Sequence, residues 1–120
     1  MDTSPLGCGM VLNYCSDVTV NNCETARNGW YGILVSESKN ISFNSNLVEA
    51  NDAEGIMIQY LFNGSENVSL TGNLIHYNKG FGIASFAGKN IKSVKNTFAG
   101  NGTDLKSNEK ISSEKIINMQ

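Results

Sequence analysis

The chain has 120 residues, which is enough for one small domain. Its formal net charge is −2, and only 17% of its residues are charged. A nucleic-acid surface would need clustered lysine and arginine residues, and no apolar run approaches the length of a membrane span. The three cysteines form neither a disulfide framework nor a paired CxxC zinc motif. The first ten residues lack the basic segment and the long apolar run of a secretory signal, so we predict no signal peptide in this chain.

The sequence is rich in residues that tolerate left-handed backbone. Asn occurs 17 times and Gly 12 times, whereas Pro occurs once. Asn and Gly adopt positive φ more readily than other residues, so many tight corners are expected. Without proline-rich or low-complexity segments, disorder is a poor explanation for this composition.

A repeat of about 23 residues organises the chain after a lead-in over residues 1–8. Its coils begin near Gly9, Gly32, Gly55 and Gly82. The third step is 27 residues long because "LFNGSE" carries an insertion of four residues. The pattern extends to about residue 104. We expect residues 105–120 to form a C-terminal edge strand or cap.

Each coil contains short pieces in which apolar residues recur two positions apart, which is the spacing of a β-strand. A leucine-rich repeat has a similar period, but it would need leucine at most inward positions. The mixed aliphatic residues found here favour an all-β, single-stranded parallel β-helix of four to five coils. Its expected inward columns are Met10, Ile33, Ile56 and Ile83; Leu12, Val35, Ile58 and Ser85; Val18, Ile41, Val68 and Ile91; Val20, Phe43, Leu70 and Ser93; and Thr25, Val48, Ile75 and Phe98.

Asparagine recurs at fixed offsets between these strand pieces. In a β-helix, such residues stack at the strand spacing and can form a hydrogen-bonded ladder, while asparagine also tolerates a left-handed corner. We therefore interpret Asn28-Gly29 as a corner of a coil and not as a hairpin turn. One predicted ladder is Asn28, Asn51, Asn78 and Asn101; a second is Asn46, Asn73 and Asn96, with Cys23 in the first coil; a further polar column is Asp17, Asn40, Asn67 and Asn90.

The order G-I-x-V, N-I-x-F and N-x-x-x-x-N resembles the right-handed parallel β-helix repeat of the pectate lyase-like superfamily. "NLVEANDAEGIMI" is also similar to alginate (mannuronan) C5-epimerase modules. The resemblance implies proteins that act on polysaccharides as lyases, hydrolases, epimerases or depolymerases, besides non-catalytic surface proteins. It also implies an extracellular or cell-surface location. Those epimerases carry a Y-G-[FI]-D-P-H motif, and "YGILVS" places Leu34 and Ser36 where Asp and His should stand.

Candidate catalytic chemistry is limited to one pair. Glu49 and His76 share an offset on adjacent coils, so they could act as acid and base, although a solvated polar pair is the simpler interpretation. Asp52 and Lys79 share another offset and are expected to form a surface ion pair. We expect no cofactor. The acidic residues Glu49, Asp52 and Glu54 leave a Ca²⁺ site as a weaker option, since no compact calcium loop is present.

Exposed aromatic rings are the main candidates for substrate binding, because sugar faces stack on such rings. Trp30 and Tyr31, with the neighbouring Arg27 and with Tyr77, form the predicted substrate-binding set, and Phe81 shares the offset of Tyr31. Packing at a corner is the alternative role for these rings. The expected partner is a polysaccharide, and four lysines would suit an anionic one, although a solvated surface also explains them: Lys79, Lys89, Lys92 and Lys95.

The outward column Val11, Leu34, Met57 and Ala84 is apolar, which predicts packing against a loop or a partner. The open ends of so short a solenoid also suggest stacking on a neighbouring β-helix. We retain two functional hypotheses. One is a module of a polysaccharide lyase, epimerase or hydrolase whose main catalytic motif is absent from these coils. The other is a non-catalytic structural or glycan-binding β-helix of a surface or phage protein.

Overall fold

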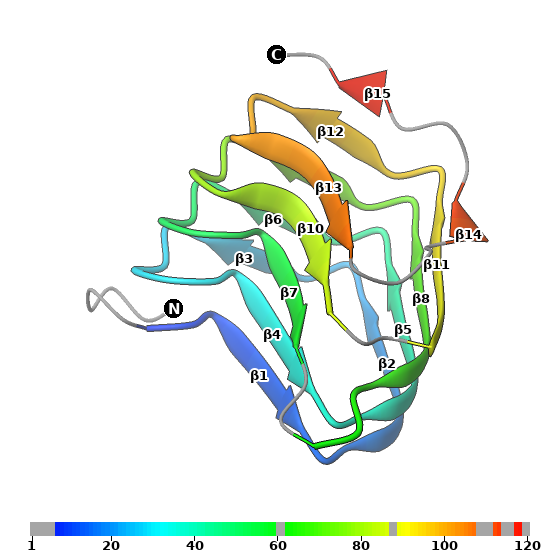
Figure 1. The fold of residues 1–120 in the computed structure, drawn as a ribbon. Helices are drawn as coiled ribbons and strands as arrows, with labels where there is room; N and C mark the ends of the chain where they lie inside the picture. The colour runs from blue at the N-terminus through cyan, green and yellow to red at the C-terminus, as the bar shows by residue number, and fades with distance from the viewer. Residues whose placement is uncertain (1–6, 60–61, 87–88, 108–111, 114–116, 119–120) are drawn as a thin grey trace.

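The chain folds into a parallel β-solenoid, as the sequence predicts (Figure 1). The computed structural model describes residues 7–59, 62–86, 89–107, 112–113 and 117–118. Three five-stranded parallel sheets form the sides of the solenoid, and each coil contributes one strand to each sheet. The described residues contain no helix long and apolar enough to span a membrane.

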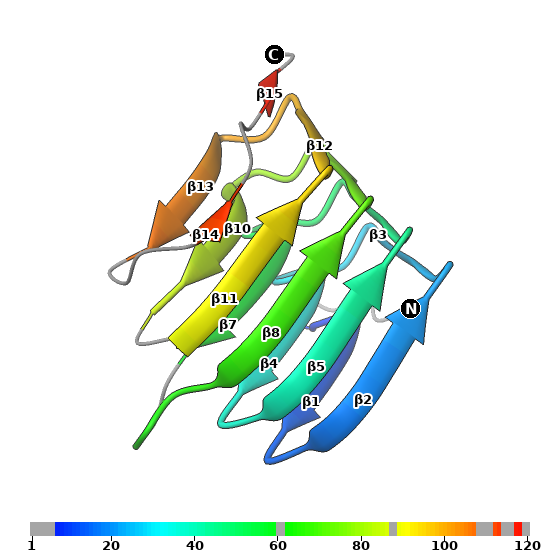
Figure 2. The same cartoon turned by 90° about the vertical axis from the view of Figure 1, so that its right-hand side faces the viewer.

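The three sheets are named A, B and C in the order in which the chain enters them. Figure 2 faces sheet B, where the strands of successive coils lie side by side. Sheet A contains β1 (Met10–Asn13), β4 (Ile33–Ser36), β7 (Ile56–Gln59), β10 (Phe81–Ser85) and β13 (Thr103–Ser107). Sheet B contains β2 (Ser16–Asn21), β5 (Lys39–Asn44), β8 (Glu66–Thr71), β11 (Lys89–Val94) and β14 (Ser112–Ser113). Sheet C contains β3 (Glu24–Ala26), β6 (Leu47–Glu49), β9 (Leu74–His76), β12 (Thr97–Ala99) and β15 (Ile117–Asn118).

The strand register confirms the predicted columns and the position of the insertion. Ser36 pairs with Gln59 across sheet A, whereas Lys39 pairs with Glu66 across sheet B. The four additional residues therefore lie between β7 and β8, and the Glu37 carboxylate holds part of this loop by accepting hydrogen bonds from the backbone N–H groups of Asn63 and Gly64 at 2.9 and 2.7 Å. The predicted lead-in falls largely outside the described residues, as does much of the predicted C-terminal cap.

The predicted inward columns form one continuous core of isoleucine, valine, leucine and phenylalanine side chains. Two serines replace aliphatic residues in the fourth coil. The hydroxyl of Ser93 accepts a hydrogen bond from the Asn96 carboxamide, but the buried hydroxyl of Ser85 has no partner among the described residues. The fourth coil therefore buries a polar group that has no hydrogen-bond partner among the described residues.

Both predicted asparagine ladders are confirmed, and both are buried. After the first member of each ladder, each carboxamide oxygen that follows an asparagine accepts from the carboxamide and from the backbone N–H of that asparagine, one coil earlier. In the first ladder, the carboxamide contacts from Asn28 to Asn51, Asn51 to Asn78 and Asn78 to Asn101 are 2.8, 2.8 and 2.9 Å. In the second ladder, Cys23 takes the first place through its backbone N–H, which donates to Asn46.

The left-handed residues do not lie where the sequence predicted them at the buried ladders. There, positive φ falls on the residue before each asparagine, for example on Arg27, Ala50 and Tyr77, and not on the asparagine or on Gly29. The ladder asparagine is thereby free to point inward and bond to the next coil. The prediction holds only for the exposed column Asp17, Asn40, Asn67 and Asn90, whose own φ values are positive.

Glycine recurs at the start of each coil because a side chain would collide with the ladder. A Cβ atom on Gly32 would lie 2.6 Å from the carboxamide nitrogen of Asn51, and one on Gly55 would lie 2.8 Å from that of Asn78. Real Cβ atoms do not approach other atoms so closely. The glycine column and the asparagine ladder therefore require one another, and together they fix the corner that leads into sheet A.

Candidate functional site

Most of the predicted site residues lie along one corner of the solenoid, between sheets C and A. We call it the C–A corner and define it as residues 27–32, 50–55, 77–80 and 100–102. It carries Arg27, Trp30, Tyr31 and Tyr77, while Glu49 and His76 end the strands that lead into it. Stacking of coils brings these residues together, because equivalent corners follow one another along the solenoid axis.

Glu49 and His76 form the close pair that the sequence predicted. The His76 Nε2 atom lies 2.5 Å from Glu49 Oε1, and the side chains are 18% and 24% exposed. The buried Nε2 atom nevertheless has no partner in the described residues that meets the geometry of a hydrogen bond, so the pair is in contact without being well aligned. The neighbouring residues in this column are Ala26 and Ala99, whose short side chains add no further titratable group.

Tyr77 presents an aromatic ring that is supported from two sides. Its side chain is 62% exposed, and its ring centroid lies 4.5 Å from that of His76. A Cβ atom on Gly100 would lie 2.6 Å from the ring, so the ring rests directly on the glycine backbone of the next coil. A side chain at residue 100 would displace this ring.

Trp30 and Tyr31 stack on each other instead of presenting two separate faces. Their ring centroids are 4.3 Å apart with an angle of 24° between the planes, and Trp30 is 37% exposed. Burial raises the pKa of the Tyr31 hydroxyl above its usual value, and the negative charges of Glu54 and Cys8 raise it further. The two residues thus form one compact aromatic unit with a carboxylate in its vicinity.

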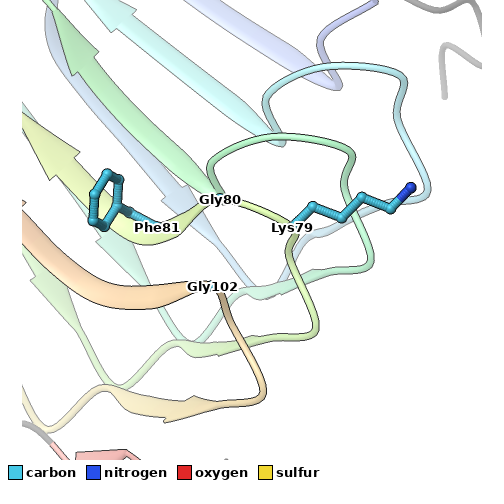
Figure 3. Close-up of a pocket in the computed structure, with 4 residues that line it drawn as sticks. All are labelled: Lys79, Gly80, Phe81 and Gly102. Carbon is cyan, nitrogen blue, oxygen red and sulfur yellow. The ribbon is translucent and has the colours of Figure 1, made fainter.

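A pocket of about 280 Å³ opens at the C-terminal end of this corner, and Lys79, Gly80, Phe81 and Gly102 line it. Figure 3 shows the Phe81 ring on one side and the Lys79 side chain extending away from it. The Lys79 ammonium lies 3.3 Å from a carboxylate oxygen of Asp52, as expected for a surface ion pair. The two glycines leave the pocket floor as bare backbone.

Glu54 connects the aromatic unit to the pocket. It occupies the same column as Tyr31 and Phe81 on the intervening coil, and its Oε2 atom accepts a hydrogen bond of 3.3 Å from the Phe81 backbone N–H. From the sequence, Glu54 was expected only as part of an acidic Ca²⁺ patch, and the pocket was not predicted. The shared offset of Glu54 and Phe81 was the signal that could have found this arrangement. In the described part of the chain, no three His, Cys, Asp or Glu side chains lie together as ligands of one metal ion.

The outer face of sheet A offers little for catalysis in these coils. Leu34 and Ser36 occupy the two motif positions there, and Ser36 is buried. Within the outward apolar column, exposure falls from 53% at Val11 to 8% at Met57 and 0% at Ala84. The C-terminal half of the column is therefore covered, in agreement with the expectation of packing, whereas its N-terminal end is open.

Comparison with known families matches residues 3–116 to the family described as "Right handed beta helix region". The chain belongs to the right-handed β-helix family. Among solved structures, it is similar to the periplasmic alginate epimerase AlgG, with a TM-score of 0.64 and 14% sequence identity. The match covers 94% of this chain and 40% of that chain, so this β-helix spans less than half the length of the epimerase. At this identity the likeness shows the fold alone, and no curated protein matches the chain.

Proposed function

We propose that this β-helix is a carbohydrate-binding module and that the C–A corner is its glycan-binding surface. The observation that carries the proposal is the exposed face of Tyr77, which is supported by His76 and Gly100 on a rigid stack of coils. An aromatic ring held in this way can stack on the apolar face of a sugar without first losing conformational freedom. The fold likeness to a polysaccharide epimerase is consistent with this role.

The geometry of the corner suits an extended polymer better than a single sugar. Aromatic side chains lie on two turns of the corner, with Trp30 and Tyr31 on one turn and Tyr77 and Phe81 two coils further along. Arg27 and Lys79 supply donors for hydroxyl groups. A polysaccharide lying along the solenoid axis could contact several of these groups at once. Such repeated weak contacts give useful affinity even where each one contributes little.

A matched pair of tyrosine substitutions tests the proposal. Tyr14 resembles Tyr77 closely: it is 60% exposed, it has positive φ, and it lies at the corner between sheets A and B. We expect Tyr77→Ala to weaken glycan binding about tenfold, which corresponds to about 1.4 kcal/mol, while Tyr14→Ala leaves binding unchanged. Affinity electrophoresis in gels that contain neutral, amino-sugar or uronate polysaccharides measures both. Equal effects of the two substitutions would count against the corner as the binding surface.

A second candidate function is acid–base chemistry on a uronate polymer, and the 2.5 Å approach of Glu49 and His76 favours it. A histidine beside a carboxylate supplies the two groups that general acid–base catalysis requires. If this pair is catalytic, Glu49→Gln and His76→Ala each abolish activity on alginate or pectate. Activity that survives both substitutions would remove the pair from consideration, and a protein that binds glycan but converts none is a binding module. In either role, we propose a location outside the cytoplasm, where such polysaccharides are found.

A further inference from the structure

We propose that the pocket beside Phe81 is a subsite for a neutral or amino sugar, and that Glu54 excludes uronates from it. The proposal rests on the carbohydrate-binding function proposed above and adds the class of sugar. It differs from the preference for an anionic glycan that the lysine-rich half of the chain suggested.

Glu54 lies at the edge of the pocket. Its carboxylate lies between Tyr31 on the preceding coil and Phe81 on the following coil, and it is held by the Phe81 backbone N–H. A Cβ atom on Gly80 would collide with both Oε2 and Cδ of Glu54, so the carboxylate rests against the glycine that lines the pocket. The negative charge is therefore fixed at the edge of the pocket.

No cation in the described side chains neutralises the Glu54 carboxylate. Among the side chains that the structure describes, no lysine or arginine lies within ion-pair distance of Glu54, and Lys79 pairs with Asp52 instead. Figure 3 shows the Lys79 side chain directed away from Phe81. The same negative charge is felt at Tyr31, where it contributes to the raised pKa of the hydroxyl.

An unpaired carboxylate at this position favours some sugars over others. A carboxylate accepts hydrogen bonds from sugar hydroxyl groups, and it pairs with the ammonium group of an amino sugar. The adjacent aromatic rings supply a stacking surface and also favour a cation. A uronate would bring a second carboxylate towards Glu54, and like charges in a partly desolvated site repel each other.

Isothermal titration calorimetry with three soluble oligosaccharides of equal length tests the proposal: a chitosan oligomer, a cello-oligomer and an oligogalacturonate. For the unaltered protein in buffer of low ionic strength, we expect the chitosan oligomer or the cello-oligomer to bind at least about tenfold more tightly than the oligogalacturonate. Glu54→Gln should reduce this ratio about tenfold, because it removes the charge and keeps the shape. Glu66→Gln is the matched control, since Glu66 is also half-buried but lies on β8, and it should leave the ratio unchanged.

The outcomes separate this proposal from the one on which it rests. If the oligogalacturonate binds best, or if Glu54→Gln leaves the ratio unchanged in a protein that unfolds at the usual urea concentration, the role of Glu54 is refuted while carbohydrate binding stands. If none of the three oligosaccharides binds, both proposals are refuted. A change of the ratio in Glu54→Gln that Tyr77→Ala does not reproduce supports Glu54 as the residue that determines specificity.

Discussion

The two asparagines at the start of the first ladder should differ strongly in their contribution to stability. The Asn51 carboxamide accepts from the backbone N–H and the carboxamide of Asn28, and it donates to Thr25 O and Asn78 Oδ1. The Asn28 side chain makes only the single bond to Asn51, and its buried Oδ1 has no partner among the described residues. The two residues are otherwise alike, since both are buried and occupy the same column.

The magnitudes follow from these contacts. Asn51→Ala leaves two buried donors of Asn28 unpaired, at about 1–3 kcal/mol each, and it removes two further hydrogen bonds worth about 0.5–1.5 kcal/mol each. We therefore expect a loss of at least about 3 kcal/mol, a large part of the roughly 5–15 kcal/mol that stabilises a domain. Asn28→Ala removes one hydrogen bond but also an unpaired buried acceptor, so its cost should stay below about 1 kcal/mol.

Urea unfolding, monitored by the fluorescence of the single tryptophan, measures both values. The unfolding slope should be the same for the two variants, so that the midpoints report stability directly. Equal losses for Asn28→Ala and Asn51→Ala would refute the reasoning, because they would show that the number of hydrogen-bond partners does not set the contribution of a ladder residue.

Three further predictions concern single positions. Gly55→Ala should destabilise the protein more than Gly72→Ala in urea unfolding. The Cβ atom at residue 55 would lie 2.8 Å from ladder and backbone atoms, whereas at residue 72 the nearest atom is 3.8 Å away and the cost is limited to the strain of an alanine at a φ of +65°, about 1–2 kcal/mol. Ser85→Ala should raise the unfolding midpoint, since it removes a buried hydroxyl without a partner; a lower midpoint would contradict this explanation. Because the pKa of Tyr31 is raised in the folded protein, the unfolded chain loses this proton first, so the associated stability is present below pH 10 and is lost as the pH rises through the folded pKa. Ultraviolet titration should show this shift, and Glu54→Gln should reduce it.

The repeat makes some site residues predictable and leaves others hidden. Glu49 and His76 could be paired from the sequence because they occupy one column on adjacent coils, and coils stack in register. The pocket beside Phe81 could not be predicted from the sequence, because its shape depends on the path of the backbone through Gly80 and Gly102 at the corner. The placement of the left-handed residues was missed for a related reason: asparagine tolerates positive φ, but a ladder asparagine must point inward, and the preceding residue therefore makes the turn.

The sequence by itself determined the architecture of this protein, because residues that recur every 23 positions can satisfy their apolar and amide groups together only by stacking. It also determined the direction of hydrogen bonding along the exposed column Asp17, Asn40, Asn67 and Asn90. The column begins at Asp17, whose carboxylate can only accept the hydrogen bond from the Asn40 carboxamide, and Asn67 and Asn90 donate in the same direction. The tertiary structure alone decided that the buried ladders run in the opposite direction, with each carboxamide donating to the asparagine of the next coil. The accepting oxygens there must also bind backbone N–H groups of the earlier coil. The tertiary structure likewise decided which outward residues are covered and that the Glu54 carboxylate rests against Gly80 at the pocket. These properties depend on the path of the backbone where neighbouring coils meet at a corner, and the alignment of the repeats does not specify that path.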